Sequence, residues 1–119
     1  MGWINTRISN LRGREAENRA AEYLKQQGLQ LLCQNFRCRR GEIDLVMQDQ
    51  DELVFVEVKY RSKSHFGEAA EYFHAAKRKK FEAAVQYFLH ERGLNPLMVP
   101  HRIDLLAIDQ ENIQWLKHL

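Results

Sequence analysis

The segments Gly41-Glu42-Ile43-Asp44-Leu45-Val46 and Val54-Phe55-Val56-Glu57-Val58-Lys59 decide how this chain can fold. Both are rich in branched apolar residues, which is typical of buried β-strands, and a short polar stretch separates them. Asp44, Glu57 and Lys59 interrupt this apolar pattern. An ion inside a buried strand costs free energy unless it is paired or holds a metal. The two segments therefore predict a hairpin that carries a charged site.

The strand period indicates how these charges are arranged. Side chains alternate between the two faces of a strand, so Glu57 and Lys59 share a face. If 49–52 form a four-residue loop, Asp44 faces Glu57 across an antiparallel pair, with Cβ atoms roughly 4.5–5.5 Å apart. The same alternation predicts that Ile43 shares a face with Leu45, opposite Asp44.

Two carboxylates at that separation repel each other unless a cation lies between them. Mg²⁺ prefers oxygen ligands at about 2.0–2.1 Å and keeps several waters. Lys59 would then orient an attacking water or offset charge on a phosphate. This arrangement predicts a metal-dependent phosphodiesterase site. The alternative is an ordinary solvated or salt-bridged acid, because Glu-x-Lys alone is a weak motif.

Length and composition indicate one domain spanning residues 1–119, with 1–9 loosely held. Hydrophobic residues make up 45% of the chain and charged residues 29%, which suits a folded globular core. We expect a cytoplasmic protein, since no apolar run approaches the roughly 18 residues of a membrane span and no secretory signal is recognisable. Cys33 and Cys38 are expected as free thiols on opposite faces of one strand.

The remaining pattern predicts a mixed α/β sheet flanked by helices, in the order α-β-β-β-α-β-β. Helices are expected over 11–27 and 68–92. Strands are expected over 29–39, 42–47, 53–61, 102–108 and 113–116.

Glu17 lies on the apolar stripe of the first predicted helix, beside Ala20, Ala21 and Leu24. Two interpretations stay open. Glu17 would supply another metal ligand or contact a ligand, or it would complement the dipole near the start of the helix.

Basic residues are concentrated near the acidic strands, although the net charge is only +2. Three clusters stand out: Arg37, Arg39 and Arg40; Lys59, Arg61 and Lys63; and Lys77, Arg78, Lys79 and Lys80. Such clusters would let a polyanion approach an acidic centre. Each cluster alone is also compatible with a solvated surface.

The sequence Gly-Glu-Ile-Asp-Leu-Val at 41–46, together with Val-Phe-Val-Glu-Val-Lys-Tyr-Arg at 54–61, resembles the signature of the YraN family of uncharacterised bacterial proteins. The resemblance covers about residues 13–108 and includes Glu17 and Lys77. That family is similar to Holliday-junction resolvases and to restriction-endonuclease-like, PD-(D/E)xK, nucleases. Two departures are Ala16, where the family usually has glycine, and Ile43, where the wider class often has proline.

The resemblance implies the roles of individual residues. Asp44, Glu57 and Lys59 match the nuclease core triad, and Glu17 matches an additional acid on the first helix. The metal would be held by Asp44, Glu57, Glu17 and the backbone carbonyl of Val58. Candidate phosphate contacts are Arg37, Arg40, Arg61 and Lys77.

The leading hypothesis is thus a Mg²⁺- or Mn²⁺-dependent DNA endonuclease, with branched DNA suggested by the resolvase resemblance. Resolvases cut two strands symmetrically, so a homodimer would fit this hypothesis. One alternative is a non-catalytic nucleic-acid-binding module on the same scaffold. Another is an interaction protein whose acids only form buried ion pairs.

Overall fold

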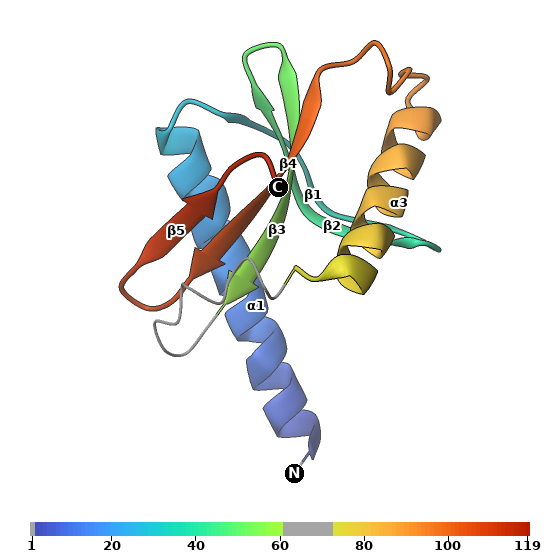
Figure 1. Ribbon diagram of the computed structural model, residues 1–119. Coiled ribbons are helices and arrows are strands. Elements are labelled where there is room, and N and C mark those ends of the chain that lie inside the picture. The colour runs from blue at the N-terminus through green and yellow to red at the C-terminus, as the bar shows by residue number, and fades with distance from the viewer. Residues whose placement is uncertain (1, 61–72) are drawn as a thin grey trace.

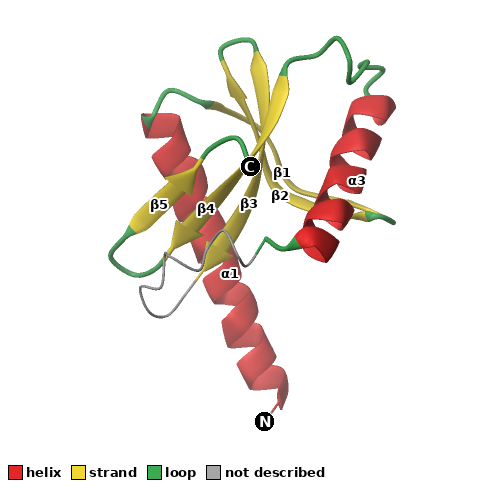
Figure 2. Ribbon diagram, in the orientation of Figure 1, coloured by secondary structure: helices red, strands yellow, loops and turns green. Residues whose placement is uncertain are grey.

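The computed structural model describes the backbone of residues 2–60 and 73–119, and the side chains of 13–60 and 73–119. A mixed sheet with strand order β1-β2-β3-β4-β5 forms the centre (Figures 1 and 2). The elements are α1 (Gly2–Gln26), β1 (Gln30–Cys38), β2 (Gly41–Asp49), β3 (Glu52–Tyr60), α3 (Ala75–Glu91), β4 (His101–Ile108) and β5 (Ile113–Leu116). The predicted α/β class and element order are confirmed.

Strand directions follow from the connections. The pairs β1–β2, β2–β3 and β4–β5 are antiparallel, whereas β3 and β4 are parallel and α3 lies between them in the chain. Parallel neighbours need such a crossover, because the chain must return to the starting end of the sheet before the second strand begins. This crossover brings the start of α3 back toward β2 and β3.

The β2–β3 hairpin has the predicted register but a shorter turn. Asp49 pairs with Glu52, so the loop contains two residues and not the four expected. Gln50 has φ of 57°, in the left-handed region that two-residue hairpin turns use. The shorter turn leaves the pairing register of the two strands unchanged, so Asp44 remains level with Glu57.

Each face of the sheet carries its own core. On one face α1 contributes Ala16, Ala20 and Leu24, which pack with strand residues including Leu45 and Val56. On the other face α3 contributes a cluster that packs with Ile43, Val46, Phe55, Ile103 and Leu105; its members are Phe81, Ala84, Val85, Phe88 and Leu89. The helices thus cover opposite faces of one sheet (Figure 2).

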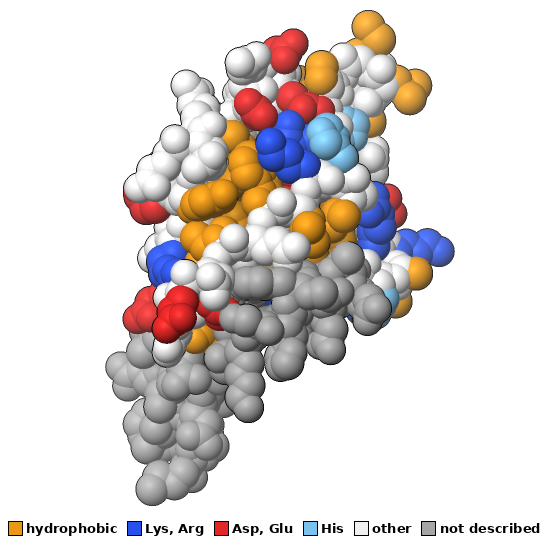
Figure 3. All heavy atoms as spheres, turned by 60° about the vertical axis from the view of Figure 1, so that its left-hand side comes forward, with side chains coloured by type: hydrophobic (Ala, Val, Ile, Leu, Met, Phe, Trp, Pro, Cys, Tyr) orange, Lys and Arg blue, Asp and Glu red, His pale blue; other side chains and the backbone are white. Residues whose placement is uncertain are grey.

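Figure 3 turns α1 and β5 toward the viewer and shows hydrophobic side chains gathered at the surface. Tyr23, Ile113 and Trp115 are partly buried members of the α1-side core and come from these two elements. Tyr23 and Trp115 meet edge to face, with ring centroids 6.2 Å apart. The α1-side core therefore reaches the surface at β5.

The bounds of both helices differ from those expected. α1 begins at Gly2, nine residues before the predicted start at Leu11. α3 begins at Ala75, whereas the pattern predicted a start at Glu68. Residues 68–72 lie outside the described residues, but Phe73 is described, precedes the helix, and packs edge to face against Phe81.

The simple alternation of faces is wrong around Asn35. Ile43 packs in the α3-side core and Leu45 in the α1-side core, although they are two residues apart on β2. Cys33 and Cys38, expected on opposite faces, both pack against the α3-side core as free thiols. Asn35 has φ of 57°, a left-handed conformation that interrupts the pleat of β1 opposite this part of β2.

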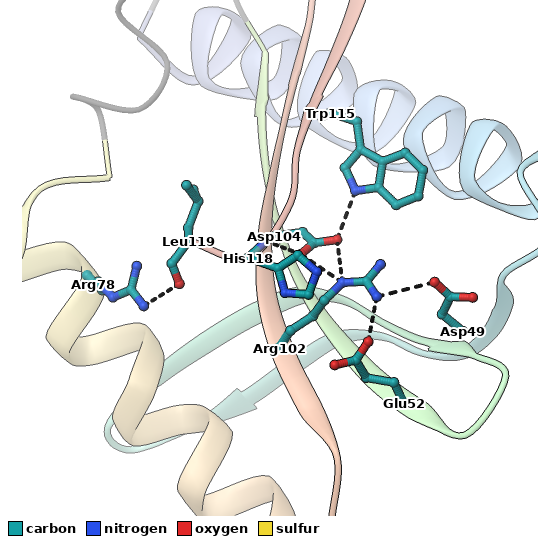
Figure 4. Close-up of polar contacts among 8 residues, drawn as sticks. All are labelled: Asp49, Glu52, Arg78, Arg102, Asp104, Trp115, His118 and Leu119. Carbon is teal, nitrogen blue, oxygen red and sulfur yellow. Dashed lines mark hydrogen bonds and ion pairs between the residues drawn. The ribbon is translucent and has the colours of Figure 1, made fainter.

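A buried polar network connects the start of β4 with the β2–β3 turn and with β5 (Figure 4). Arg102 donates to the carboxylates of Asp104, Glu52 and Asp49 at 2.7–3.2 Å. Asp104 is fully buried and also accepts hydrogen bonds from Trp115 Nε1 and the backbone N–H of His118. Burial alone would lower the pKa of Arg102, but its hydrogen bonds to Glu52 and Asp104 outweigh this and raise it.

A neighbouring contact fastens the end of the described chain to α3. Arg78 donates a hydrogen bond to the backbone oxygen of Leu119, and the N–H of Leu119 donates to the carbonyl of Ile103 at 2.8 Å. Among the described residues no helix combines the length and apolar character needed to cross a membrane.

Candidate metal centre

A cavity of about 670 Å³ opens between α1, the β1–β2 turn, the end of β3 and the first turns of α3. Acidic residues lining it are Glu17, Glu42, Asp44 and Glu57. Basic residues lining it are Arg37, Arg39, Arg40, Lys77 and Lys80. The cavity thus brings acids from α1, β2 and β3 together with basic residues from β1, the β1–β2 turn and α3, and Val58 and Tyr60 also line it.

Asp44 lies where β2 and β3 separate. The ladder between the two strands ends at the pair Leu45 and Val56. Beyond that pair, Asp44 Oδ2 accepts a hydrogen bond of 2.8 Å from the backbone N–H of Val58. Burial first, and then the neighbouring Glu57, raise the pKa of Asp44 to about 8, while the bond from Val58 opposes the rise. The carboxylate is therefore well oriented but strained by its surroundings when ionised.

Glu57 is buried, with 7% of the residue exposed. Its Oε2 lies 3.3 Å from the ammonium nitrogen of Lys77, which reaches it from the first turn of α3. A buried carboxylate requires such a counterion. Asp44 and Glu57 hence form a close acidic pair for which one positive charge is already present.

Glu17 approaches this pair from α1. Burial, followed by the charge of Asp44, raises the pKa of Glu17 to about 7, and a hydrogen bond from Asn35 acts in the opposite direction. Among the described residues, Glu17 Oε1 is buried without a hydrogen-bond partner. A buried polar atom of this kind requires an explanation, and a role as a metal ligand would supply one.

The donor set fits a hard divalent cation. Glu17, Asp44 and Glu57 offer only oxygen atoms, which Mg²⁺ and Mn²⁺ accept. Burial and the neighbouring carboxylates disfavour the ionised forms of Glu17 and Asp44 and raise their pKa values, and a bound cation would stabilise those ionised forms. In the part of the chain that the structure describes, no three His, Cys, Asp or Glu side chains already form a complete cluster that could hold a metal. The pair and Glu17 are thus candidate ligands and not an assembled site.

Of the basic residues predicted for the site, some line the cavity and others do not. Lys59 is half-buried on β3 and is not among the residues lining the cavity. Arg37 and Arg40 line it, and the Arg37 guanidinium lies 3.2 Å from the exposed carboxylate of Glu42. Lys77 lines it but points to Glu57. Arg61 lies outside the described residues.

Several lining residues were not singled out as site residues from the sequence. Lys80 lies three residues after Lys77 on α3, a spacing that places both on one helix face and could have revealed it. Gly41 approaches α3 so closely that a Cβ atom there would lie 2.8 Å from the backbone oxygen of Lys80. The close contact between Gly41 and Lys80 could not be predicted from the sequence, because it depends on the packing of β2 against α3.

A second, polar hollow adjoins the first. It is lined by Gly13, Arg14, Glu17, Asn18, Gln34, Asn35 and Arg37. Gln34 donates to Asn18 Oδ1 at 2.9 Å, which links β1 to α1 across this hollow. Since Glu17 and Arg37 line both hollows, the second hollow borders the first at these two residues.

Comparison with known proteins identifies relatives over most of the chain. A family model described as Uncharacterised protein family UPF0102 matches residues 16–108. A UPF0102 protein of Janthinobacterium sp. (strain Marseille) is 48% identical over 108 residues, which cover 91% of this chain and 85% of the relative. UPF0102 protein Pfl01_4685 of Pseudomonas fluorescens (strain Pf0-1) is 46% identical over 108 residues, covering 89% of each chain.

A UPF0102 protein of Colwellia psychrerythraea is 41% identical over 111 residues, covering 90% of this chain and 86% of the relative. The matched span contains Glu17, Asp44, Glu57 and Lys77. These similarities confirm the resemblance to the YraN family, and the chain belongs to the uncharacterised protein family UPF0102.

Proposed function

We propose that this protein is a divalent-metal-dependent endonuclease that hydrolyses phosphodiester bonds in DNA. One observation carries the proposal: Glu17, Asp44 and Glu57, from three different elements, line one cavity that arginines and lysines also line. The carboxylates suit a cation, and the arginines and lysines suit a phosphate backbone.

The acidic residues would hold the ion. Asp44 and Glu57 would be its main ligands, with the carbonyl of Val58 and the carboxylate of Glu17 completing the set. A bound Mg²⁺ or Mn²⁺ supplies Lewis-acid polarisation of the phosphate and lowers the pKa of a bound water. The bond from Val58 N–H holds Asp44 in one orientation, which is the kind of support that metal ligands generally need.

The basic residues would position the nucleic acid. Arg37, Arg40 and Lys77 line the cavity, and contacts of this type fix the backbone without reading sequence. Arg61 is a further candidate, as predicted from the sequence. Lys59, two residues after Glu57 on β3, is the ammonium that the nuclease resemblance assigns to the attacking water or to charge in the transition state.

Branched DNA is the substrate that the resemblance to Holliday-junction resolvases favours. Symmetric cutting of a junction would require two active sites, and a homodimer would supply them.

The test is strand scission of linear, flapped and four-way DNA by the full chain, with Mg²⁺, Mn²⁺ or EDTA. We expect cleavage only with the divalent ion, and its loss in Glu57→Ala and Lys59→Ala while the far-ultraviolet spectrum stays unchanged. Glu22→Ala is a matched control, because Glu22 is an exposed carboxylate of α1 paired with Lys25. Metal-independent cleavage, or full cleavage by Glu57→Ala, would contradict the proposal.

A non-catalytic nucleic-acid-binding module is the second candidate. The ion pair between Lys77 and Glu57 favours it, since it already neutralises one carboxylate without metal. That module would bind DNA with a strong salt dependence and would cut none of the three substrates.

A further inference from the structure

The ammonium of Lys77 lies 3.3 Å from Glu57 Oε2, at the place where the proposed function requires a divalent cation. We propose that Lys77 is an exchangeable counterion: it neutralises Glu57 in the metal-free protein and is displaced when a divalent cation binds. The inference rests on the cation site in the proposed function, but not on cleavage.

The surroundings of the two groups are unequal. The Glu57 side chain is 10% exposed, whereas that of Lys77 is 36% exposed. A buried carboxylate needs a positive partner, but a lysine at the surface can exchange its partner for water at little cost. Glu57 therefore depends on the pair more than Lys77 does.

The position of Lys77 on its helix is also unfavourable. Lys77 lies in the first turn of α3, and that turn contains no acidic residue. The N-cap residue His74 makes no side-chain capping hydrogen bond. Cations are disfavoured at a helix N-terminus, where the dipole is positive. Glu57 offsets this penalty while the pair lasts, so the pair stabilises the Lys77 ammonium less than the same pair would away from a helix N-terminus.

Displacement would serve the substrate as well as the metal. Lys77 and Lys80 are three residues apart on α3, and both line the cavity. Once released from Glu57, the Lys77 ammonium would join Lys80 and the arginines of the cavity in contacting a phosphate. Lys77 would thus neutralise the site when it is empty and bind the backbone when the site is loaded.

Isothermal titration of MnCl₂ into the full chain without DNA tests the exchange. We expect Lys77→Met to tighten Mn²⁺ binding roughly five- to tenfold, because the competitor is gone. Lys77→Arg should stay near the wild-type Kd, since it retains a competing cation. Lys80→Met is the matched control, which removes the same charge from the same cavity, and its Kd should change by less than about twofold.

If Lys77→Met does not fold, Lys77→Gln replaces it in the same titration. An unchanged or weaker Kd in the neutral variant would overturn the exchange, as would equal tightening in Lys80→Met or the absence of Mn²⁺ binding in every variant. The outcomes separate this inference from the proposed function. Tightening without any DNA cleavage supports the exchange and contradicts the nuclease, whereas metal-dependent cleavage with equal Kd values does the reverse.

Discussion

Asp44 accepts a 2.8 Å hydrogen bond from the backbone N–H of Val58. Val58 directly follows Glu57, and the carboxylates of Asp44 and Glu57 are neighbours. The Asp44 side chain thus accepts from a backbone N–H where β2 and β3 separate, beyond Leu45 and Val56, the last pair of their ladder. This bond fixes the acid of one strand against the acid of the next. The acidic pair is consequently a property of the hairpin, and Glu17 and Lys77 are added by the packing of the two helices.

The first prediction concerns pH. The pKa of Asp44 is raised from 3.8 to about 8 and that of Glu17 from 4.5 to about 7, so the folded state retains protons that the unfolded state releases. The free energy of unfolding of the metal-free protein should therefore decrease as the pH rises from about 4 to about 8. Asp44→Asn should remove much of this decrease, because the amide oxygen can still accept from Val58.

Thermal melting in EDTA at about pH 5 and about pH 8 measures this effect. We expect the Tm of wild type to fall by at least about 5 °C more than that of Asp44→Asn. Glu22→Gln, which alters an exposed carboxylate of α1, should behave like wild type. Parallel pH profiles for wild type and Asp44→Asn would refute the prediction.

The second prediction concerns the metal. Ligand carboxylates must be ionised to bind a cation, so Mn²⁺ should stabilise the protein more at about pH 8 than at about pH 5. At a free concentration one hundred times Kd, the stabilisation should reach about 2.7 kcal/mol. Addition of EDTA should reverse it. A Tm increase that survives in Asp44→Asn would place the ion elsewhere.

The third prediction concerns Gly41. A Cβ atom there would lie 2.8 Å from the backbone oxygen of Lys80, so Gly41→Ala must push α3 away from β2. We expect destabilisation of about 1–3 kcal/mol in urea unfolding. Gly13→Ala is the control: nothing lies within 4 Å of its Cβ position in α1, and alanine should stabilise that helix by up to about 1 kcal/mol. Equal effects of the two substitutions would contradict the close approach.

The fourth prediction concerns the network around Arg102. Arg102→Met would leave the fully buried Asp104 without its cation, and we expect a loss of about 3–5 kcal/mol in chemical denaturation. Lys25→Met breaks an exposed pair with Glu22 and should change stability by less than about 1 kcal/mol. A loss below 1 kcal/mol in Arg102→Met would show that the network contributes little.

The hairpin and its acidic pair could be predicted from the sequence because they depend on a local period of two. Asp44 and Glu57 have matching parity about the turn, and the pairing of Leu45 with Val56 preserves it. The length of the turn did not affect that parity. The face of Ile43 could not be predicted, because it depends on the left-handed conformation of Asn35 on another strand.

The basic side of the site was only partly predictable. Lys77 was expected to contact phosphate, but its pairing with Glu57 depends on how α3 returns to the sheet between β3 and β4. The partners of Arg102, outside the site, were also only partly predictable. Asp104 is two residues away in the sequence. Asp49 and Glu52 are about fifty residues distant and contact Arg102 only through the parallel pairing of β3 with β4.

Anomalous diffraction at the manganese edge, from crystals of the full chain grown with MnCl₂, tests the central claim most directly. The account predicts a peak in contact with carboxylate oxygens of both Asp44 and Glu57, at roughly 2.0–2.2 Å, and its absence in Glu57→Gln. A protein that shows no peak there, with Lys77 still paired to Glu57 at high Mn²⁺, would contradict the metal-dependent site.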